Sequence, residues 1–342
     1  NPPKRLHPSL VSRIKVMANM DIAERRIPQD GRITLILNSK TVDVRVASLP
    51  TAYGEKLTLR LLNRNEKLIT IPELGFPDSQ LDIFYRIMDL PYGFILVTGP
   101  TGSGKSTTLY AALSRLNSVD KNIITIEDPI ERRIDGINQT QVNVRAGMTF
   151  ASGLRSFLRN DPDIMMVGEI RDFETARIAI ESALTGHMVL STLHTNTAAG
   201  AITRLGDMGI EPFLTASSLT GIIAQRLARV LCPHCKEPYE IAGEDILRSI
   251  PDFPLDSHKD VIKLYRPKSC YKCNNTGFLG RVGIYELLPI SQTIRKLILE
   301  GESDNIINDV AIDEGMISIR QHALTKVKDG TTSIEEILRV IV

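Results

Sequence analysis

The hydrophobic and polar positions divide the chain into two patterns. Before about residue 90, apolar and polar residues alternate over residues 33–37, 41–46 and 56–62, and turn sequences containing glycine bound these runs. Alternation with a period of two is typical of half-buried strands. With a helical pattern over residues 8–20, it predicts a small α+β domain with a meandering sheet.

From residue 93 to about 230, runs of consecutive apolar residues alternate with helical patterns. The predicted strands are 94–97, Ile123–Glu127, Ile164–Val167 and 188–192, and the predicted helices are 107–116, 151–159 and Phe173–Leu184. Buried strands separated by helices indicate a parallel sheet covered by helices. The predicted fold class is therefore α/β.

The last part of the chain contains all the cysteines and then further helical patterns. We divide the chain into a small first domain at 1–88, an α/β core at 89–230, a cysteine module at 231–275 and a helical C-terminal subdomain at 276–342. A second helix is expected near residues 80–88, just before the core.

A complete phosphate-binding motif, G-x-x-x-x-G-K-[ST], joins the first core strand to the helix after it. The candidate nucleotide-binding residues are Gly99, Pro100, Thr101, Gly102, Ser103, Gly104, Lys105, Ser106 and Thr107. Glycines let backbone N–H groups turn inward around phosphates, Lys105 supplies a positive charge, and the Ser106 hydroxyl can ligate Mg²⁺. A glycine-rich connecting loop is the alternative, but the strand–loop–helix context favours a nucleoside-triphosphate site.

Carboxylates follow two of the predicted strands. Residues 163–169 resemble a Walker B strand that ends at Glu169, although Gly168 stands where many such ATPases have the aspartate that binds Mg²⁺. Glu169 is the candidate group for polarising the attacking water. The acidic residues at 127–131, among them Glu131, follow another strand, and ligands bind at the carboxyl ends of strands in open α/β sheets. A solvated loop charge or a helix cap is the alternative for each carboxylate.

His194 lies just past the predicted strand at 188–192. An imidazole there can sense the γ-phosphate or the waters around Mg²⁺, and we treat it as a candidate phosphate sensor. His187 precedes the same strand, and for this residue a packed structural role and a functional role both stay open.

Four arginines are candidates for sensing phosphate. Arg45 and Arg60 lie on predicted strands of the first domain, and Arg155 and Arg159 share one face of a predicted helix. Surface arginines are usually solvated. If nucleotide binds between the two domains, these side chains can neutralise the charge that develops in the transition state.

The four cysteines form two C-x₂-C pairs, Cys232 with Cys235 and Cys270 with Cys273, separated by 34 residues. Each pair can place two thiolates on one tetrahedral metal ion, which predicts a structural Zn²⁺ site. A redox-active pair or a disulfide is the alternative, and a reducing compartment weakens the disulfide reading. His234 is expected to be a bystander because four thiolates already complete the site.

Composition narrows the function classes. The 41 basic and 40 acidic residues give a formal net charge of +1, aromatic residues make up 5% and there is no tryptophan. A nucleic-acid translocase should carry a basic stripe with interleaved aromatics, so nucleic acid is not an expected partner. No apolar run approaches the length of about 18 residues that a membrane span needs. The sequence has no signal-peptide pattern and begins at Asn1, which suggests a fragment of a longer product.

Several motifs together resemble the secretion-superfamily ATPases of type II secretion and type IV pili. They are the phosphate loop GPTGSGKSTTLY, the aspartate box TIEDPIE, the Walker B region DPDIMMVGEIRD and the histidine box TGHMVLSTLHTN. SRIKVM, RIPQDGRI and VDVRVASLP extend the resemblance through the first domain. Within the superfamily, the chain is most similar to the GspE-type secretion ATPases and next to the pilus-extension ATPases. The retraction ATPases lack a four-cysteine module.

The resemblance implies a RecA-like ATPase core and a cytoplasmic homo-hexamer that uses ATP, Mg²⁺ and Zn²⁺. Domain closures in the hexamer would drive the addition of pseudopilins in the inner membrane. An N-terminal domain not seen here would dock on inner-membrane platform proteins, so membrane association would be peripheral.

By position in the motifs, the resemblance assigns phosphate and Mg²⁺ binding to Lys105 and Ser106. It identifies Glu131 and Glu169 as the catalytic acidic residues. The four arginines fall at the superfamily's phosphate-sensing positions. Arg132-Arg133 depart from the family pattern, in which an aromatic and an acidic residue are frequent. A nucleotide-gated scaffold without turnover is the remaining alternative.

Overall fold

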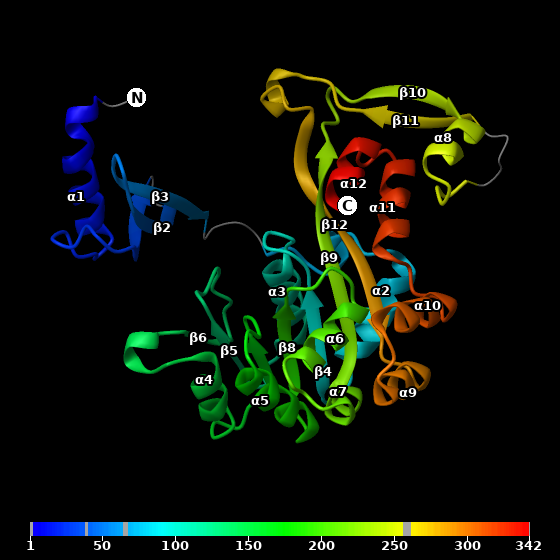
Figure 1. Ribbon diagram of the computed structural model, residues 1–342, viewed down its shortest axis with the longest axis horizontal. Coiled ribbons are helices and arrows are strands. Elements are labelled where there is room, and N and C mark those ends of the chain that lie inside the picture. The colour runs from blue at the N-terminus through cyan, green and yellow to red at the C-terminus, as the bar shows by residue number, and fades with distance from the viewer. Residues whose placement is uncertain (1–2, 38–39, 64–67, 256–260, 342) are drawn as a thin grey trace. The chain divides into compact units, whose positions relative to one another are not determined.

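The computed structural model in Figure 1 describes residues 3–37, 40–63, 68–255 and 261–341. The chain forms two compact units. The first comprises Asn1–Leu68 with Glu131–Arg133, and the second comprises Ile69–Ile130 with Ile134–Val342. The helix expected near residues 80–88 therefore lies in the second unit.

The first unit contains one helix against a three-stranded sheet of described residues. Its elements are α1 (His7–Met17), β1 (Gln29–Leu37), β2 (Lys40–Thr51) and β3 (Gly54–Asn63), paired antiparallel in the order β1-β2-β3. Ile33, Val44 and Val46 alternate along the strands into its small core. The strands extend beyond the apolar runs because antiparallel pairing continues through their polar ends.

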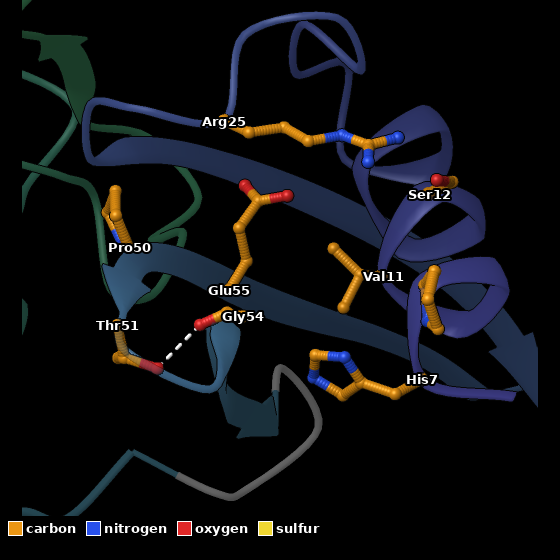
Figure 2. A pocket seen from close by; sticks show the side chains of 9 residues that line it. His7, Val11, Ser12, Arg25, Pro50, Thr51, Gly54 and Glu55 are labelled. Carbon is orange, nitrogen blue, oxygen red and sulfur yellow. Dashed lines mark hydrogen bonds between the residues drawn. The ribbon is translucent and has the colours of Figure 1, made fainter. Parts of the chain in front are cut away.

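A small cavity of about 180 Å³ lies between α1 and the turn that joins β2 to β3 (Figure 2). Figure 2 shows His7 and Val11 on one side, Arg25 above, and Glu55 pointing into the space between them. The carboxylate of Glu55 is buried and accepts a hydrogen bond at 2.5 Å from Nζ of Lys15, which is buried as well. This ion pair compensates both buried charges, so the cavity has no uncompensated charge at Glu55.

The second unit is built on a sheet with the strand order β12-β9-β4-β8-β7-β5-β6 among the described residues. Its strands are β4 (Gly93–Thr98), β5 (Ile123–Glu127), β6 (Asn138–Gln141), β7 (Ile164–Val167), β8 (Met188–Leu193), β9 (Leu219–Leu231) and β12 (Phe278–Pro289). All neighbours pair in parallel except β12 with β9. Every residue of β4, β5, β7 and β8 is buried, as the continuous apolar runs predicted.

Helices connect these strands and cover the sheet. They are α2 (Asp78–Met88), α3 (Lys105–Leu116), α4 (Phe150–Phe157), α5 (Phe173–Leu184), α6 (Ala199–Asp207) and α7 (Pro212–Ser218). Phe94 and Leu96 of β4 share one hydrophobic core with residues of α4 to α7. Helix α2 approaches β9 closely, since a Cβ on Gly221 would lie 2.8 Å from Cδ1 of Ile87. The predicted α/β fold is thus confirmed.

After β9 the chain forms a side module and then returns to the sheet. The module has β10 (Glu237–Ala242), α8 (Gly243–Ser249) and β11 (Val261–Arg266), with β10 antiparallel to β11. The predicted helical region then begins with the long strand β12, which pairs with β9 at the edge of the central sheet. The helices α9 (Gln292–Glu300), α10 (Asp304–Asp313), α11 (Ile319–Lys328) and α12 (Ile334–Ile341) follow it.

Serine side chains cap three of these last helices. Ser291, Ser303 and Ser318 each accept a backbone N–H from the first turn that follows. Such caps satisfy donors that have no partner inside the helix. Within the described residues, no helix has the combination of length and apolar character that crossing a membrane requires.

Candidate functional site

The phosphate loop runs from the end of β4 to the first residue of α3, as the motif predicted. Gly99, Gly102 and Gly104 have φ values of 149°, 81° and 91°, a region that other residues avoid. At Gly99 the packing is also tight, because a Cβ there would lie 2.4 Å from the backbone oxygen of Gln225. Gly99 and Gly104, at the two ends of the loop, therefore adopt a backbone conformation that larger residues would distort.

Lys105 and Ser106 occupy the first turn of α3, where the helix dipole favours negative charge. The Nζ of Lys105 donates to the backbone oxygens of Gly99 at 2.8 Å and Pro100 at 3.2 Å, so the ammonium lies over the loop. Ser106 is half-buried and Thr107 is exposed. The candidate phosphate ligands thus converge at one helix N-terminus.

A cavity of about 640 Å³ opens beside this loop. Residues 100–103 form one side, and Asn196, Arg226 and the end of α12 contribute to the others. Arg226 donates to both the backbone oxygen and Oδ1 of Asn196, at 3.1 and 3.0 Å. Burial lowers the pKa of Arg226 from its ordinary value. The volume is in the range of small-molecule sites.

Glu169 follows β7 and lies in a small cluster of charges. Nη2 of Arg171 donates to Oε1 of Glu169 at 2.5 Å, and Nε2 of His194 lies 3.5 Å from Oε2. Burial raises the pKa of Glu169, but these two partners outweigh it, and the pKa lies below the ordinary 4.5. The structure brings Glu169 and His194 together, because β7 and β8 are adjacent parallel strands.

Arg171 was missed by the sequence analysis. It lies two residues after Glu169 and ion-pairs with its carboxylate. An arginine that close to a candidate acid was an available signal. Gly168 has a physical explanation as well, since a Cβ there would lie 3.3 Å from Cα of Glu127 on β5. The close approach of β5 leaves little room for a longer side chain.

The acidic residues after β5 fall in different environments. Glu127 is buried, and its carboxylate accepts hydrogen bonds from Oγ1 of Thr125 at 2.7 Å, Nε2 of Gln139 at 3.0 Å and the phenol of Tyr110. Glu131 is exposed and belongs to the first compact unit. Lys105, Ser106 and Glu169 belong to the second unit.

The two arginine pairs also lie in different units. Arg155 on α4 forms an exposed ion pair with Glu174, and Nη1 of Arg159 donates to the backbone oxygen of Arg155 at 3.0 Å. Arg45 lies opposite Arg60 in the register of β2 with β3. On its other side, Arg45 lies opposite Arg32 of β1, a residue that the sequence analysis did not select.

His187 precedes β8, as the sequence indicated. Its Nδ1 lies 2.9 Å from the backbone oxygen of Ser182, at the end of α5. This contact belongs to the packing of α5 on the sheet and favours the structural reading of His187.

The four cysteines converge on one point. Their Sγ atoms all lie within 4.8 Å of one another. The separations are 3.8 Å for Cys232 and Cys270, 3.8 Å for Cys235 and Cys273, and 3.6 Å for Cys270 and Cys273. A tetrahedral Zn²⁺ with bonds of about 2.3 Å requires sulfur separations of about 3.8 Å. The cluster therefore fits zinc, and all four thiols are free of disulfides.

Comparison with known proteins identifies the family of the chain. The family described as "Type II/IV secretion system protein" matches residues 1–339. The chain belongs to this family. It is 54% identical over 339 residues to the type II secretion system ATPase E of Vibrio cholerae, covering 99% of this chain and 66% of that protein. It therefore spans slightly less than two thirds of the length of that relative.

Relatives from pili are also similar. The type IV pilus assembly ATPase PilB of Myxococcus xanthus is 49% identical, over 98% of this chain and 59% of its own length. Among solved structures, the pilus retraction motor PilT with bound ADP has a TM-score of 0.65 and 29% identity, covering 92% of this chain and 77% of that one. The Legionella pneumophila ATPase DotB has a TM-score of 0.66 at 22% identity, with the same coverage, which supports the fold alone.

Proposed function

We propose that this family member hydrolyses Mg²⁺-ATP to power a type II secretion system. One observation carries the proposal: the phosphate loop after β4 and the Glu169–His194 pair after β7 and β8 lie at the same end of neighbouring parallel strands. Phosphoryl transfer needs phosphate binding, charge neutralisation and a positioned water, and this edge offers groups for each. The relatives named as ATPases support it.

The side chains divide these tasks. Lys105 and the inward N–H groups of the loop would hold the β- and γ-phosphates. The Ser106 hydroxyl and the Glu169 carboxylate present the oxygen donors that Mg²⁺ prefers, and a bound Mg²⁺ would offset the phosphate charge. Because its pKa is lowered, Glu169 is ionised at neutral pH and can accept a hydrogen bond from the attacking water.

The remaining candidates would act around this centre. We assign Glu131 as a second acidic residue and His194 as a sensor of the γ-phosphate. Arg45, Arg60, Arg155 and Arg159 would neutralise phosphate charge when domains or subunits close on the nucleotide. The domain division at residues 88, 230 and 275 belongs to the same proposal.

We infer a cytoplasmic homo-hexamer that is peripheral to the inner membrane. Platform proteins of the secretion system would bind outside the part of the relatives that this chain spans. The coupling to pseudopilins would be indirect. Assembly of a type IV pilus is the second candidate function, and the similarity to PilB favours it. Secretin and pseudopilin genes beside the coding sequence would support secretion, whereas a major pilin gene would support pilus assembly.

We also propose that Cys232, Cys235, Cys270 and Cys273 hold a structural Zn²⁺. Four thiolates complete a tetrahedral site, so the ion would stabilise the module and take no part in hydrolysis. The backbone N–H of Gly277 donates to Sγ of Cys273 at 3.3 Å, which would help to orient that ligand. Metal analysis of the purified protein should give one zinc per chain, and a metal-free folded module would exclude the site.

The variant Lys105→Ala tests the nucleotide site. Removing the ammonium should lower kcat/KM for ATP by at least about a hundredfold, because the phosphates then lose the positive charge of Lys105. Lys121→Ala is the matched control, since Lys121 is an exposed lysine after α3 in the same unit. Circular dichroism checks that both variants fold. Wild-type turnover in Lys105→Ala would refute the site, and strong stimulation by DNA would favour a translocase.

A further inference from the structure

Gln225 is a buried polar residue on β9, the strand that pairs with β4 on the side away from β8. Its side chain is 1% exposed. A buried amide costs free energy unless its polar atoms find partners, and a leucine would fill similar space without that cost. The hydrogen-bond partners of this amide therefore indicate why a glutamine, and not a leucine, occupies this position.

The side-chain amide of Gln225 contacts the end of the phosphate loop. Its Oε1 accepts a hydrogen bond from Oγ1 of Thr108 at 2.7 Å, and both groups are buried. Thr108 lies one helical turn after Lys105 on α3. The Nε2 of the same amide lies against Gly104, since a Cβ on that glycine would come within 2.7 Å of it.

The backbone of Gln225 contacts the start of the loop. A Cβ on Gly99 would lie 2.4 Å from the backbone oxygen of Gln225. Gly99 and Gly104 are the first and last glycines of the loop, and both have positive φ. One residue of β9 thus touches both ends of the loop and the first turn of the helix that carries Lys105.

We propose that Gln225 is a positioning residue for the phosphate loop. It fixes the spacing between Gly99 and Gly104 and anchors the first turn of α3 through Thr108, so that the loop N–H groups and Lys105 hold the geometry that phosphate binding requires. The inference rests on the proposed nucleotide-binding function. It adds a residue outside all the motifs from which that function was derived.

The position of Gln225 predicts which kinetic constant changes. A misplaced loop weakens phosphate contacts that are present in both the bound substrate and the transition state. Such a loss raises KM and leaves kcat nearly constant. A residue that serves only the packing of β9 on α3 would lower the unfolding midpoint and leave KM alone.

The experiment compares Gln225→Leu with the wild-type chain in steady-state ATP hydrolysis and in titration with a fluorescent ADP analogue. We expect KM and the dissociation constant to rise about tenfold, as expected for the loss of one buried hydrogen bond, with kcat within about twofold. Gln80→Leu is the matched control. Gln80 is equally buried on α2, and its Nε2 donates to the backbone oxygen of Ile317 at 3.1 Å, outside the motif residues.

Variants of Thr108 keep the test decisive if Gln225→Leu fails to fold. Thr108→Val removes the hydroxyl donor and should raise KM in the same way, whereas Thr108→Ser keeps the donor and should restore nearly wild-type binding. Unchanged KM in Gln225→Leu or in Thr108→Val, beside a wild-type chain that binds the analogue, would overturn the inference alone. A wild-type chain that binds no Mg²⁺-nucleotide would instead overturn the proposed function.

Discussion

Glu127 and Glu169 stand at the ends of adjacent parallel strands, β5 and β7, yet their surroundings differ. Glu127 is buried, and three donors from Tyr110, Thr125 and Gln139 occupy its carboxylate. The Glu169 side chain is about one fifth exposed, and its ionic partners, Arg171 and His194, have exposed side chains. Both residues match the expectation that ligands bind at carboxyl ends of strands.

The difference indicates that a position at a strand end is not sufficient for such a role. A carboxylate whose oxygens already accept strong hydrogen bonds from packed groups has little capacity to orient a water. Glu127 ties α3 to β5 and β6 and thereby supports the shape of the site. Glu169 has an accessible carboxylate beside the sensor candidate His194.

The sharpest test of this comparison is Glu169→Gln. An amide cannot accept a proton as the carboxylate does, so turnover should fall by about 10²- to 10⁴-fold while binding of a fluorescent ADP analogue changes by less than about threefold. Single-turnover kinetics and the titration measure the two effects separately. Undiminished turnover would shift the role to Glu131 and break the comparison.

Glu127→Leu should affect stability more than turnover. The substitution leaves the donors of Tyr110, Thr125 and Gln139 without their acceptor, at a cost of about 1–3 kcal/mol in the free energy of unfolding. Urea unfolding measures it, with the exposed residue Glu181 as a control: Glu181→Leu should change the value by less than about 1 kcal/mol. A fully stable Glu127→Leu chain with lost turnover would reverse the assignment of the two carboxylates.

The smallest expected effect is a pH-dependent loss of folding stability in the variant Arg171→Gln. Because the pKa of Glu169 is lowered below 4.5 in the folded chain, the ionised group stabilises the fold above pH 4.5, and this contribution disappears as pH falls through the lowered value. Removing Arg171 should therefore cost about 0.2–1 kcal/mol at pH 6 and less at pH 3. Urea unfolding of the wild-type and Arg171→Gln chains at pH 6 and at pH 3 measures this change in the difference between their midpoints. A difference independent of pH would contradict it.

Much of the fold was predictable from local patterns. The bounds of β5, β7 and α5 agree with the prediction, because continuous apolar runs and helical periodicity are local properties. The return of β12 to the sheet was not predicted. It pairs with β9 although 46 residues separate the two strands, and a pairing between distant segments leaves little trace in either one.

The candidate site divides in the same way. The phosphate loop and the two C-x₂-C pairs were found from spacing, since their ligands come from short contiguous segments. Arg171 and Gln225 were not found. The ion pair of Arg171 with Glu169 depends on where the side chains point after β7. The contacts of Gln225 with the phosphate loop depend on the pairing of β9 with β4 in the sheet.

The sequence by itself determined the chemistry that is available: a phosphate loop, carboxylates after strands, and thiols in metal-binding spacing. It did so because backbone conformation at glycines and ligand spacing within a few residues are set locally. Only the tertiary structure decided which groups meet. It paired Glu169 with His194, saturated Glu127 with donors, and placed Gln225 against both ends of the loop. Those choices depend on strand order and packing, which contacts between distant residues establish.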